Sequence, residues 1–146
     1  MPLQAAGHNT GNALYFPLAE AVREIRLLEI LPRNGVDKIS CKLSTASLGP
    51  DLYYHALSYV LGKSGITEEI LVNGDTMAVT TNLAAALRQL RDDPPEELAT
   101  IPLSKRLLWA DAICINQTDT RERSSQVALM GDIYRQVICM GEDPAV

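Results

Sequence analysis

The sequence is poor in the residues that build metal centres and disulfide frameworks. Its 146 residues include three cysteines, Cys41, Cys114 and Cys139, and two histidines, His8 and His55. No two cysteines form a Cys-x-x-Cys pair, so a four-ligand zinc site is not expected. Free cysteine is among the most buried residue types, which predicts reduced thiols inside the protein.

Long apolar runs and an excess of positive charge are also missing. No run of about 18 apolar residues is present to span a membrane, and the first ten residues lack the features of a secretory signal. Thirteen Lys and Arg residues against 18 Asp and Glu residues give a net charge of −5, which disfavours nucleic-acid binding. We therefore expect a cytoplasmic protein with no membrane span and no nucleic-acid partner.

What is present is typical of one globular core. Hydrophobic residues make up 47% of the sequence and charged residues 21%, and the length suits a single domain. Residues 1–21 carry no sustained hydrophobic period, so they are expected to be a loosely ordered N-terminal segment. Residues 22–146 are expected to form the domain.

The first half of that domain predicts two β-hairpins. Residues 23–31 and 38–44 flank turn-forming residues, and the second run alternates polar and apolar side chains. Short β-prone runs also flank Asn73-Gly74, a pair typical of a two-residue hairpin turn. Between the hairpins, the apolar and aromatic run 53–61 predicts a buried strand.

The second half alternates helix and strand patterns. Leucines at i, i+4 and i+7 predict a helix over 80–93, and the apolar run 107–115 predicts a buried strand that contains Asp111. Asp119 and Glu122 match a capping box, which predicts a helix to about residue 136, followed by a strand over 137–141. The expected apolar face of this helix is Val127, Met130, Ile133 and Tyr134.

Together these patterns predict an α/β fold with a mostly parallel sheet, crossover helices and N-terminal β-hairpins. Ligands of such sheets gather beyond the carboxyl ends of the strands. The expected functional lip therefore includes Ser58 and the turn after residue 114.

Each candidate residue in this lip has a structural and a functional interpretation. Asp111, inside an apolar run, needs a structural partner or faces a ligand. Ser58 offers a hydroxyl to a ribose or phosphate, or packs under a loop. Asn116 and Gln117 either hold a ligand or tie down their own turn.

Three further candidates lie on the following helix. Glu122 is best explained by the capping box, with a catalytic carboxylate as the alternative. Arg123 and Gln126 lie one turn apart, where they form either a solvated face or a polar patch for a ligand or partner. A Cys114–His55 nucleophile pair is disfavoured because no third orienting group is identifiable.

Several of these segments, in this order and spacing, resemble the fungal heterokaryon incompatibility (HET) domain. The similarity covers about residues 24–141 and extends through Glu122-Arg123 and Gln126. The segments that carry it are YHALSYVLG (54–62), ILVNG (70–74), TNLAAALR (81–88) and LWADAICINQ (108–117).

The resemblance implies a module of fungal non-self recognition, an effector of programmed cell death that acts through protein partners or self-association. It also implies a three-layer fold like the Toll/interleukin-1 receptor (TIR) domain. Some members of that wider group cleave NAD with a glutamate on a helix. NAD is therefore an alternative substrate for this chain, although no cofactor is evident from the residues.

The sequence departs from the HET pattern in three places. Leu61 replaces the usual tryptophan, Cys139-Met140-Gly141 replaces Trp-Leu-Gly, and no downstream Trp-x-x-Gln-Glu segment follows. These departures predict a chain truncated at its C-terminus or a degenerate copy. An inactive fragment is thus the third functional alternative, and the absent downstream glutamate disfavours NAD cleavage.

Overall fold

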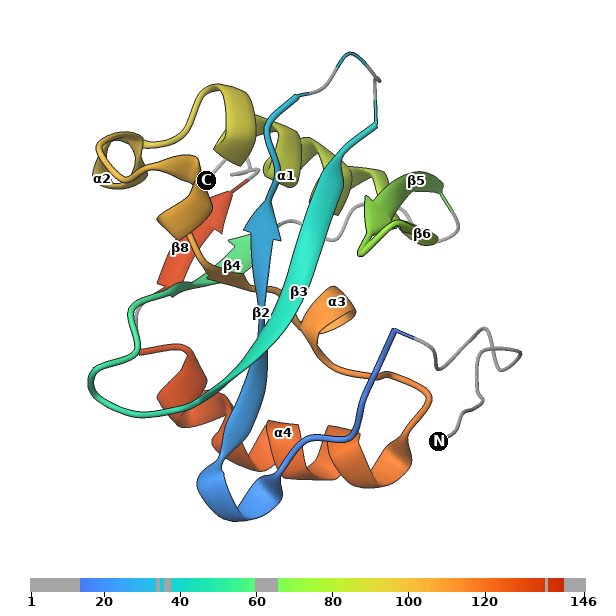
Figure 1. The fold of residues 1–146 in the computed structure, drawn as a ribbon, viewed down its shortest axis with the longest axis vertical. Helices are drawn as coiled ribbons and strands as arrows, with labels where there is room; N and C mark the ends of the chain where they lie inside the picture. Colours follow the sequence, from blue (N-terminus) through green and yellow to red (C-terminus); the bar gives the residue numbers. More distant parts are fainter. Residues whose placement is uncertain (1–13, 34, 36–37, 60–65, 136, 141–146) are drawn as a thin grey trace, which may run out of the picture.

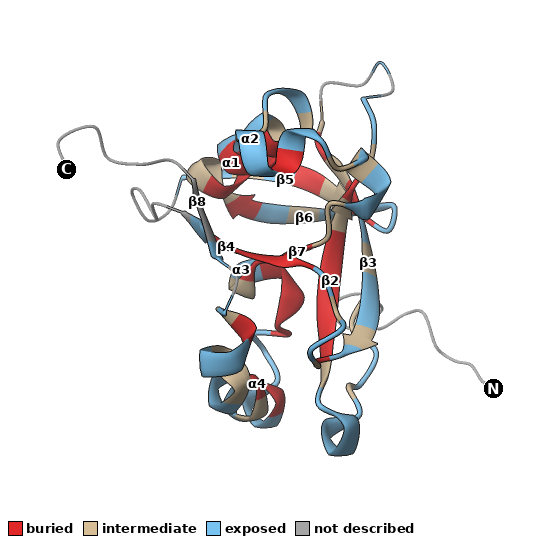
Figure 2. Ribbon diagram, turned by 90° about the vertical axis from the view of Figure 1, so that its left-hand side faces the viewer, coloured by how far each residue is buried: buried red, intermediate tan, exposed pale blue. Residues whose placement is uncertain are grey.

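The computed structural model describes residues 14–33, 35, 38–59, 66–135 and 137–140. A seven-stranded sheet has helices on both sides (Figures 1 and 2). Its strands, in chain order, are β2 (Glu24–Ile30), β3 (Ser40–Ser47), β4 (His55–Tyr59), β5 (Thr67–Val72), β6 (Asp75–Thr80), β7 (Leu108–Trp109) and β8 (Val137–Met140). The helices are α1 (Thr81–Asp92), α2 (Glu96–Ala99), α3 (Asp111–Cys114) and α4 (Thr120–Ile133), with 3-10 turns η2 (Glu20–Val22) and η3 (Leu103–Lys105).

The predicted α/β class is confirmed, but the sheet is mixed rather than mostly parallel. The strand order is β6-β5-β3-β2-β7-β4-β8. β4 is parallel to β7 and β8, and β3 is parallel to β5. The pairs β2–β3, β2–β7 and β5–β6 are antiparallel. The two hairpins supply strands to the same sheet as the crossover units, which explains the mixture.

Both predicted hairpins are confirmed. In the first, β2 and β3 pair from Glu24 opposite Ser47 to Ile30 opposite Cys41. In the second, Asn73 and Gly74 have φ angles of 52° and 86°, the positive values that a two-residue hairpin turn requires. The Asn73 side chain also accepts a hydrogen bond from the backbone N–H of Leu43 at 2.9 Å, which ties the two hairpins together.

The predicted helix over 80–93 is confirmed as α1. The Thr80 hydroxyl accepts a hydrogen bond from the backbone N–H of Leu83 at 3.2 Å and so caps the first turn. The helix packs against β4, β5 and β6. Figure 2 shows α1 and α2 on one side of β4 and β7, with α3 and α4 on the other. The buried residues of α1 are Leu83, Ala84, Ala86, Leu87 and Leu90.

The prediction of one strand over 107–115 is wrong for most of that run. Only Leu108 and Trp109 belong to β7, and Asp111 begins the short helix α3. The helical turn forms because the N–H groups of Ile113 and Cys114 both donate to the carbonyl of Ala110, at 3.0 and 2.7 Å. A short apolar run fits a buried helical turn as well as a strand, so its pattern did not separate the two.

The helix α4 begins where the capping residue predicted but ends at Ile133, earlier than expected. Its buried residues are Glu122, Gln126 and Ile133, whereas Val127 is 57% exposed. The predicted apolar face is therefore wrong at Val127, because the preceding residue, the polar Gln126, occupies the inward position. The strand expected after this helix is confirmed as β8. Among the described helices, none is long and apolar enough to cross a membrane.

Candidate functional site

A buried ion pair joins the N-terminal hairpin to the start of α4. Arg26 lies in the middle of β2, and Glu122 lies in the first turn of α4. Nη1 and Nη2 of the arginine donate to Oε2 and Oε1 of the glutamate at 2.5 and 2.8 Å, so the contact is two-pronged. The residues are 1% and 8% exposed, which makes this a desolvated pair.

Backbone groups make further hydrogen bonds to this pair. The guanidinium of Arg26 also donates to the carbonyls of Cys114 at 3.1 Å and Phe16 at 2.8 Å. Oε2 of Glu122 accepts the backbone N–H of Asn116 at 2.7 Å. Buried charges are tolerated when they are paired and hydrogen-bonded, and these contacts supply partners to both charged groups. The pair thus holds together β2, α4, the turn after α3 and residues 14–19, which we call the strap.

Tyr15 covers the ion pair from the strap. Its ring centre lies 4.8 Å from Cζ of Arg26, a cation–π distance, and its hydroxyl donates to the carbonyl of Ile113 at 2.7 Å. Burial, with the nearby Cys114 thiol as the next cause, raises the pKa of the Tyr15 phenol to about 12. The phenol therefore stays protonated and serves as a hydrogen-bond donor.

The capping-box prediction for Glu122 is confirmed in one half and wrong in the other. Asp119 does cap α4, since its carboxylate accepts the backbone N–H of Glu122 at 3.1 Å. The Glu122 carboxylate, however, turns inward to Arg26 instead of returning to Asp119. A charged guanidinium is a stronger partner than one backbone N–H, and the Asp119 N–H is satisfied by the carbonyl of Asn116 at 3.1 Å.

The structure separates Arg123 from Gln126. Arg123 is exposed, whereas Gln126 is only 2% exposed and donates from Nε2 to the carbonyl of Glu24 at 3.2 Å. The predicted solvated face is therefore confirmed for Arg123 and wrong for Gln126, and a ligand or partner role for either residue stays a prediction. Oε1 of Gln126 is buried and has no hydrogen-bond partner among the described residues.

Asn116 and Gln117 tie down their own turn. Oδ1 of Asn116 accepts both the backbone N–H and the hydroxyl of Thr118, at 3.3 and 2.8 Å. Nε2 of Gln117 donates to the carbonyl of Asp111 at 2.8 Å. Asp111 is half-buried at the start of α3, so it is not the buried strand carboxylate that the sequence predicted. Asn116 and Gln117 thus make the contacts expected from the loop-stabilising interpretation, and their ligand-holding role stays a prediction.

The remaining candidates are placed apart from the ion pair. Ser58 is exposed on β4, while His55, three residues earlier, is buried. Burial raises the pKa of the Cys114 thiol to about 12, which disfavours the thiolate that a nucleophile needs. Cys41 and Cys114 are free and buried, as predicted, and the Cys139 side chain lies outside the described residues. The described residues contain no group of three or more His, Cys, Asp or Glu side chains placed to hold a metal ion.

Sequence reasoning missed Arg26 and Tyr15. Arg26 interrupts the apolar run Ile25-Arg26-Leu27-Leu28, and a cation in such a run indicates a buried charge that needs a distant acid. Tyr15 carried no comparable signal, because the segment before residue 22 has no periodicity. The boundary expected between residues 21 and 22 stays a prediction, although two strap residues contribute to this site.

Comparisons with known proteins identify the family of this chain. Residues 54–141 match the family model described as "Heterokaryon incompatibility protein (HET)". The chain is 39% identical over 127 residues to "Heterokaryon incompatibility protein 6, OR allele" of Neurospora crassa. That alignment covers 80% of this chain and 18% of the relative, so the chain spans under a fifth of the relative's length. No solved structure matches significantly. The chain therefore belongs to the fungal heterokaryon incompatibility (HET) family.

Proposed function

We propose that this chain is a cytoplasmic effector module of fungal non-self recognition that triggers programmed cell death through protein assembly. Family membership and a relative named as a heterokaryon incompatibility protein support this proposal. The partner is either another copy of the chain or a second protein of the same pathway.

The observation that carries the proposal is the engagement of Glu122. Both of its carboxylate oxygens bind Arg26, and one also accepts the backbone N–H of Asn116. Polar residues in segment 111–126, which resembles the HET family, thus hold the fold together. A reaction centre would instead need a carboxylate that is free to meet a substrate. The surface outside that segment is then what a partner contacts.

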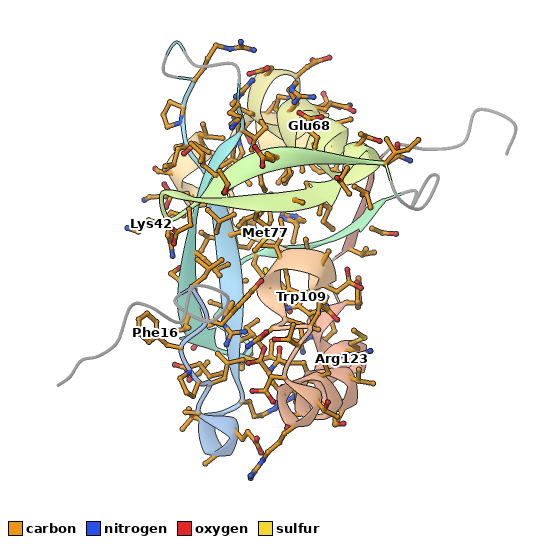
Figure 3. The ribbon with its side chains drawn as sticks, turned by 90° about the vertical axis from the view of Figure 1, so that its right-hand side faces the viewer. Phe16, Lys42, Glu68, Met77, Trp109 and Arg123 are labelled. Carbon is orange, nitrogen blue, oxygen red and sulfur yellow. The ribbon has the colours of Figure 1, made fainter. Side chains whose placement is uncertain are left out.

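Phe16 is our candidate contact residue on that surface. Its carbonyl is fixed by Arg26 at 2.8 Å, yet its side chain belongs to a residue that is 75% exposed. Figure 3 shows the ring projecting away from the ribbon of the strap. An apolar ring presented on an anchored backbone needs little ordering when a partner covers it, which favours protein binding.

A TIR-like NAD glycohydrolase is the second candidate. It is favoured by a groove of about 620 Å³ that is lined partly by Tyr15, Asn116 and Thr118, a volume in the range of small-molecule sites. Such an enzyme stabilises positive charge at the ribose with a carboxylate. Glu122 does not meet this need while it is bound to Arg26, so we place this candidate second.

The two candidates are separated by expressing the full chain from an inducible promoter in fungal cells. We expect cell death from the wild-type chain and much less from Phe16→Ser. The control Tyr53→Ser should keep full activity, since Tyr53 lies in the loop before β4 and is 50% exposed. Circular dichroism of the purified variants checks that they fold. If the Phe16→Ser variant kills cells as well as the wild type does, Phe16 is not a contact residue for the partner.

The enzymatic candidate is tested with the same purified chain. We expect no nicotinamide release from NAD above the blank. Turnover that Glu122→Gln abolishes in a folded protein would instead establish the NAD-cleaving candidate and overturn assembly as the primary activity.

A further inference from the structure

A second groove lies beside the ion pair, between the strap and α4. It measures about 410 Å³, with Pro17 and Leu18 on the strap side and Ser125 and Gln126 on the helix side. Gln126 also lines an adjoining hollow of about 240 Å³, so this residue lies where the two hollows meet. Residue 126 is therefore central to the groove, although it is only 2% exposed.

The orientation of the Gln126 amide is fixed by its neighbour. The carbonyl of Glu24 only accepts hydrogen bonds, so the amide nitrogen must face it, as the 3.2 Å contact from Nε2 requires. Oε1 is then directed elsewhere, and it has no partner among the described residues. A buried acceptor without a donor is uncommon and leaves one hydrogen bond open to an incoming donor.

The charges that line the groove favour a cationic donor. Glu20 and Asp119 contribute carboxylates, whereas the charge of Glu122 is already neutralised by Arg26. Arg121 is the one cation lining the groove within the described part of the chain. Its side chain is 87% exposed, and its Nε lies 3.5 Å from Oε2 of Glu20, so this acid already accepts a guanidinium.

An anionic ligand is a poorer match for the same groove. The start of α4 would attract an anion only if its N–H groups were free. The Asp119 carboxylate already binds one of them, the N–H of Glu122, at 3.1 Å, and places a negative charge at this helix end. The helix end therefore brings its own negative charge to this site.

We propose that this groove binds an arginine side chain of a partner protein, which donates N–H groups to Gln126 and Glu20. A guanidinium carries five N–H donors in one plane, enough to serve an amide oxygen and a carboxylate together. The incoming arginine displaces Arg121 from Glu20. This inference rests on the proposed function, since it states the chemistry by which a partner would be recognised.

The test titrates the isotope-labelled full chain with the peptide acetyl-Gly-Arg-Gly-amide and monitors binding by NMR. The matched probe is the same peptide with citrulline, which keeps the shape of arginine but has no charge. We expect saturable shifts of α4 and strap resonances with the arginine peptide and much weaker ones with citrulline.

Three variants give effects of different sign. Glu20→Gln is expected to weaken arginine-peptide binding by about three- to fivefold, the scale of an exposed ion pair. Gln126→Met is expected to weaken it as well, whereas Arg121→Gln is expected to tighten it by removing the internal competitor. The control Glu69→Gln removes the same charge from an exposed pair with Lys38 on another element and should change nothing.

Two results would overturn the inference: equal binding of the arginine and citrulline peptides, or weaker binding by a folded Arg121→Gln variant. The second result would show that Arg121 does not compete with the peptide for Glu20. Neither result depends on cell death. If the groove does not bind the arginine peptide but the chain still kills cells, only this inference is refuted. If the groove binds the peptide but the chain does not kill cells, only the proposed function is refuted.

Discussion

Helices α1 and α4 have similar lengths, 12 and 14 residues, but bury opposite kinds of side chain. α1 buries only leucine and alanine, whereas α4 buries Glu122 and Gln126 before its one buried isoleucine. Apolar burial is non-directional, so it stabilises α1 without demanding one geometry. The contacts of α4 are directional hydrogen bonds to Arg26 and to the backbone of β2. One helix supplies core area, and the other fixes where the candidate site lies.

The strongest way to break this comparison is to remove the acid from α4. Glu122→Ala leaves the Arg26 charge buried without its partner, so we expect a loss of about 3 to 5 kcal/mol in the free energy of unfolding, measured by urea titration. The control is Asp132→Ala on the same helix, which removes an exposed pair with Arg23 and should cost under about 1 kcal/mol. Equal losses in the two variants would show that the Arg26 pair is solvated.

The apolar helix is tested at Leu87, which is fully buried in α1. Leu87→Ala should destabilise the protein by about 3 kcal/mol, within the range for cavity-forming core substitutions. Leu87→Met should cost less than about 1.5 kcal/mol, because volume is conserved. Glu122→Met, by contrast, should gain nothing from its volume. A Glu122→Met variant as stable as the wild type would refute the directional role of α4.

The capping residues sharpen the comparison because a side chain caps the first turn of each helix. Thr80→Ala and Asp119→Ala should each cost about 1 kcal/mol, since each removes a side-chain acceptor from one backbone N–H. Thermal unfolding of both variants measures the loss. A much larger loss at Asp119 would mean that its carboxylate also supports the turn that contains Asn116.

The smallest effect is expected at Tyr15. Tyr15→Phe removes one hydrogen bond to Ile113 and should cost about 0.5 to 1 kcal/mol at neutral pH. Because burial raises the folded-state pKa of Tyr15 to about 12, the unfolded chain ionises first, near pH 10. The stabilisation by the phenol is therefore complete below about pH 10 and is lost as the pH rises towards 12.

The stability gap between the wild type and Tyr15→Phe should accordingly narrow between pH 9 and pH 11, as measured by urea unfolding at each pH. A gap that stays constant over this range would show that the phenol is exposed to water and that the strap does not cover Arg26.

Local patterns predicted much of the fold. The leucine spacing of α1, the Asn73-Gly74 turn and the Asp119 cap each depend on residues close together in the sequence, and each is confirmed. The run 107–115 failed because continuous apolar sequence carries no period that separates a strand from a helical turn. The sheet was expected to be mostly parallel because strand patterns do not state which strands pair.

The candidate site was less predictable, because its central contact spans 96 positions of the sequence. A capping box accounts for Glu122 locally, so nothing nearby indicates that its carboxylate turns to Arg26. The same long-range contact places Gln126 inside and leaves Val127 outside, against the order of their hydrophobicity. Side-chain polarity predicts exposure only where the core holds no opposite charge that can pair with the side chain.

The separation of Arg26 from Glu122 also orders the events of folding during synthesis. Arg26 leaves the ribosome long before residue 122, and until then no described acid is available to neutralise it inside the core. Packing the first hairpin in its final position would bury a lone charge, which is strongly unfavourable. The N-terminal hairpin therefore reaches its final packing only after α4 has been made, and the finished surface is displayed only by a chain that has been translated past α4.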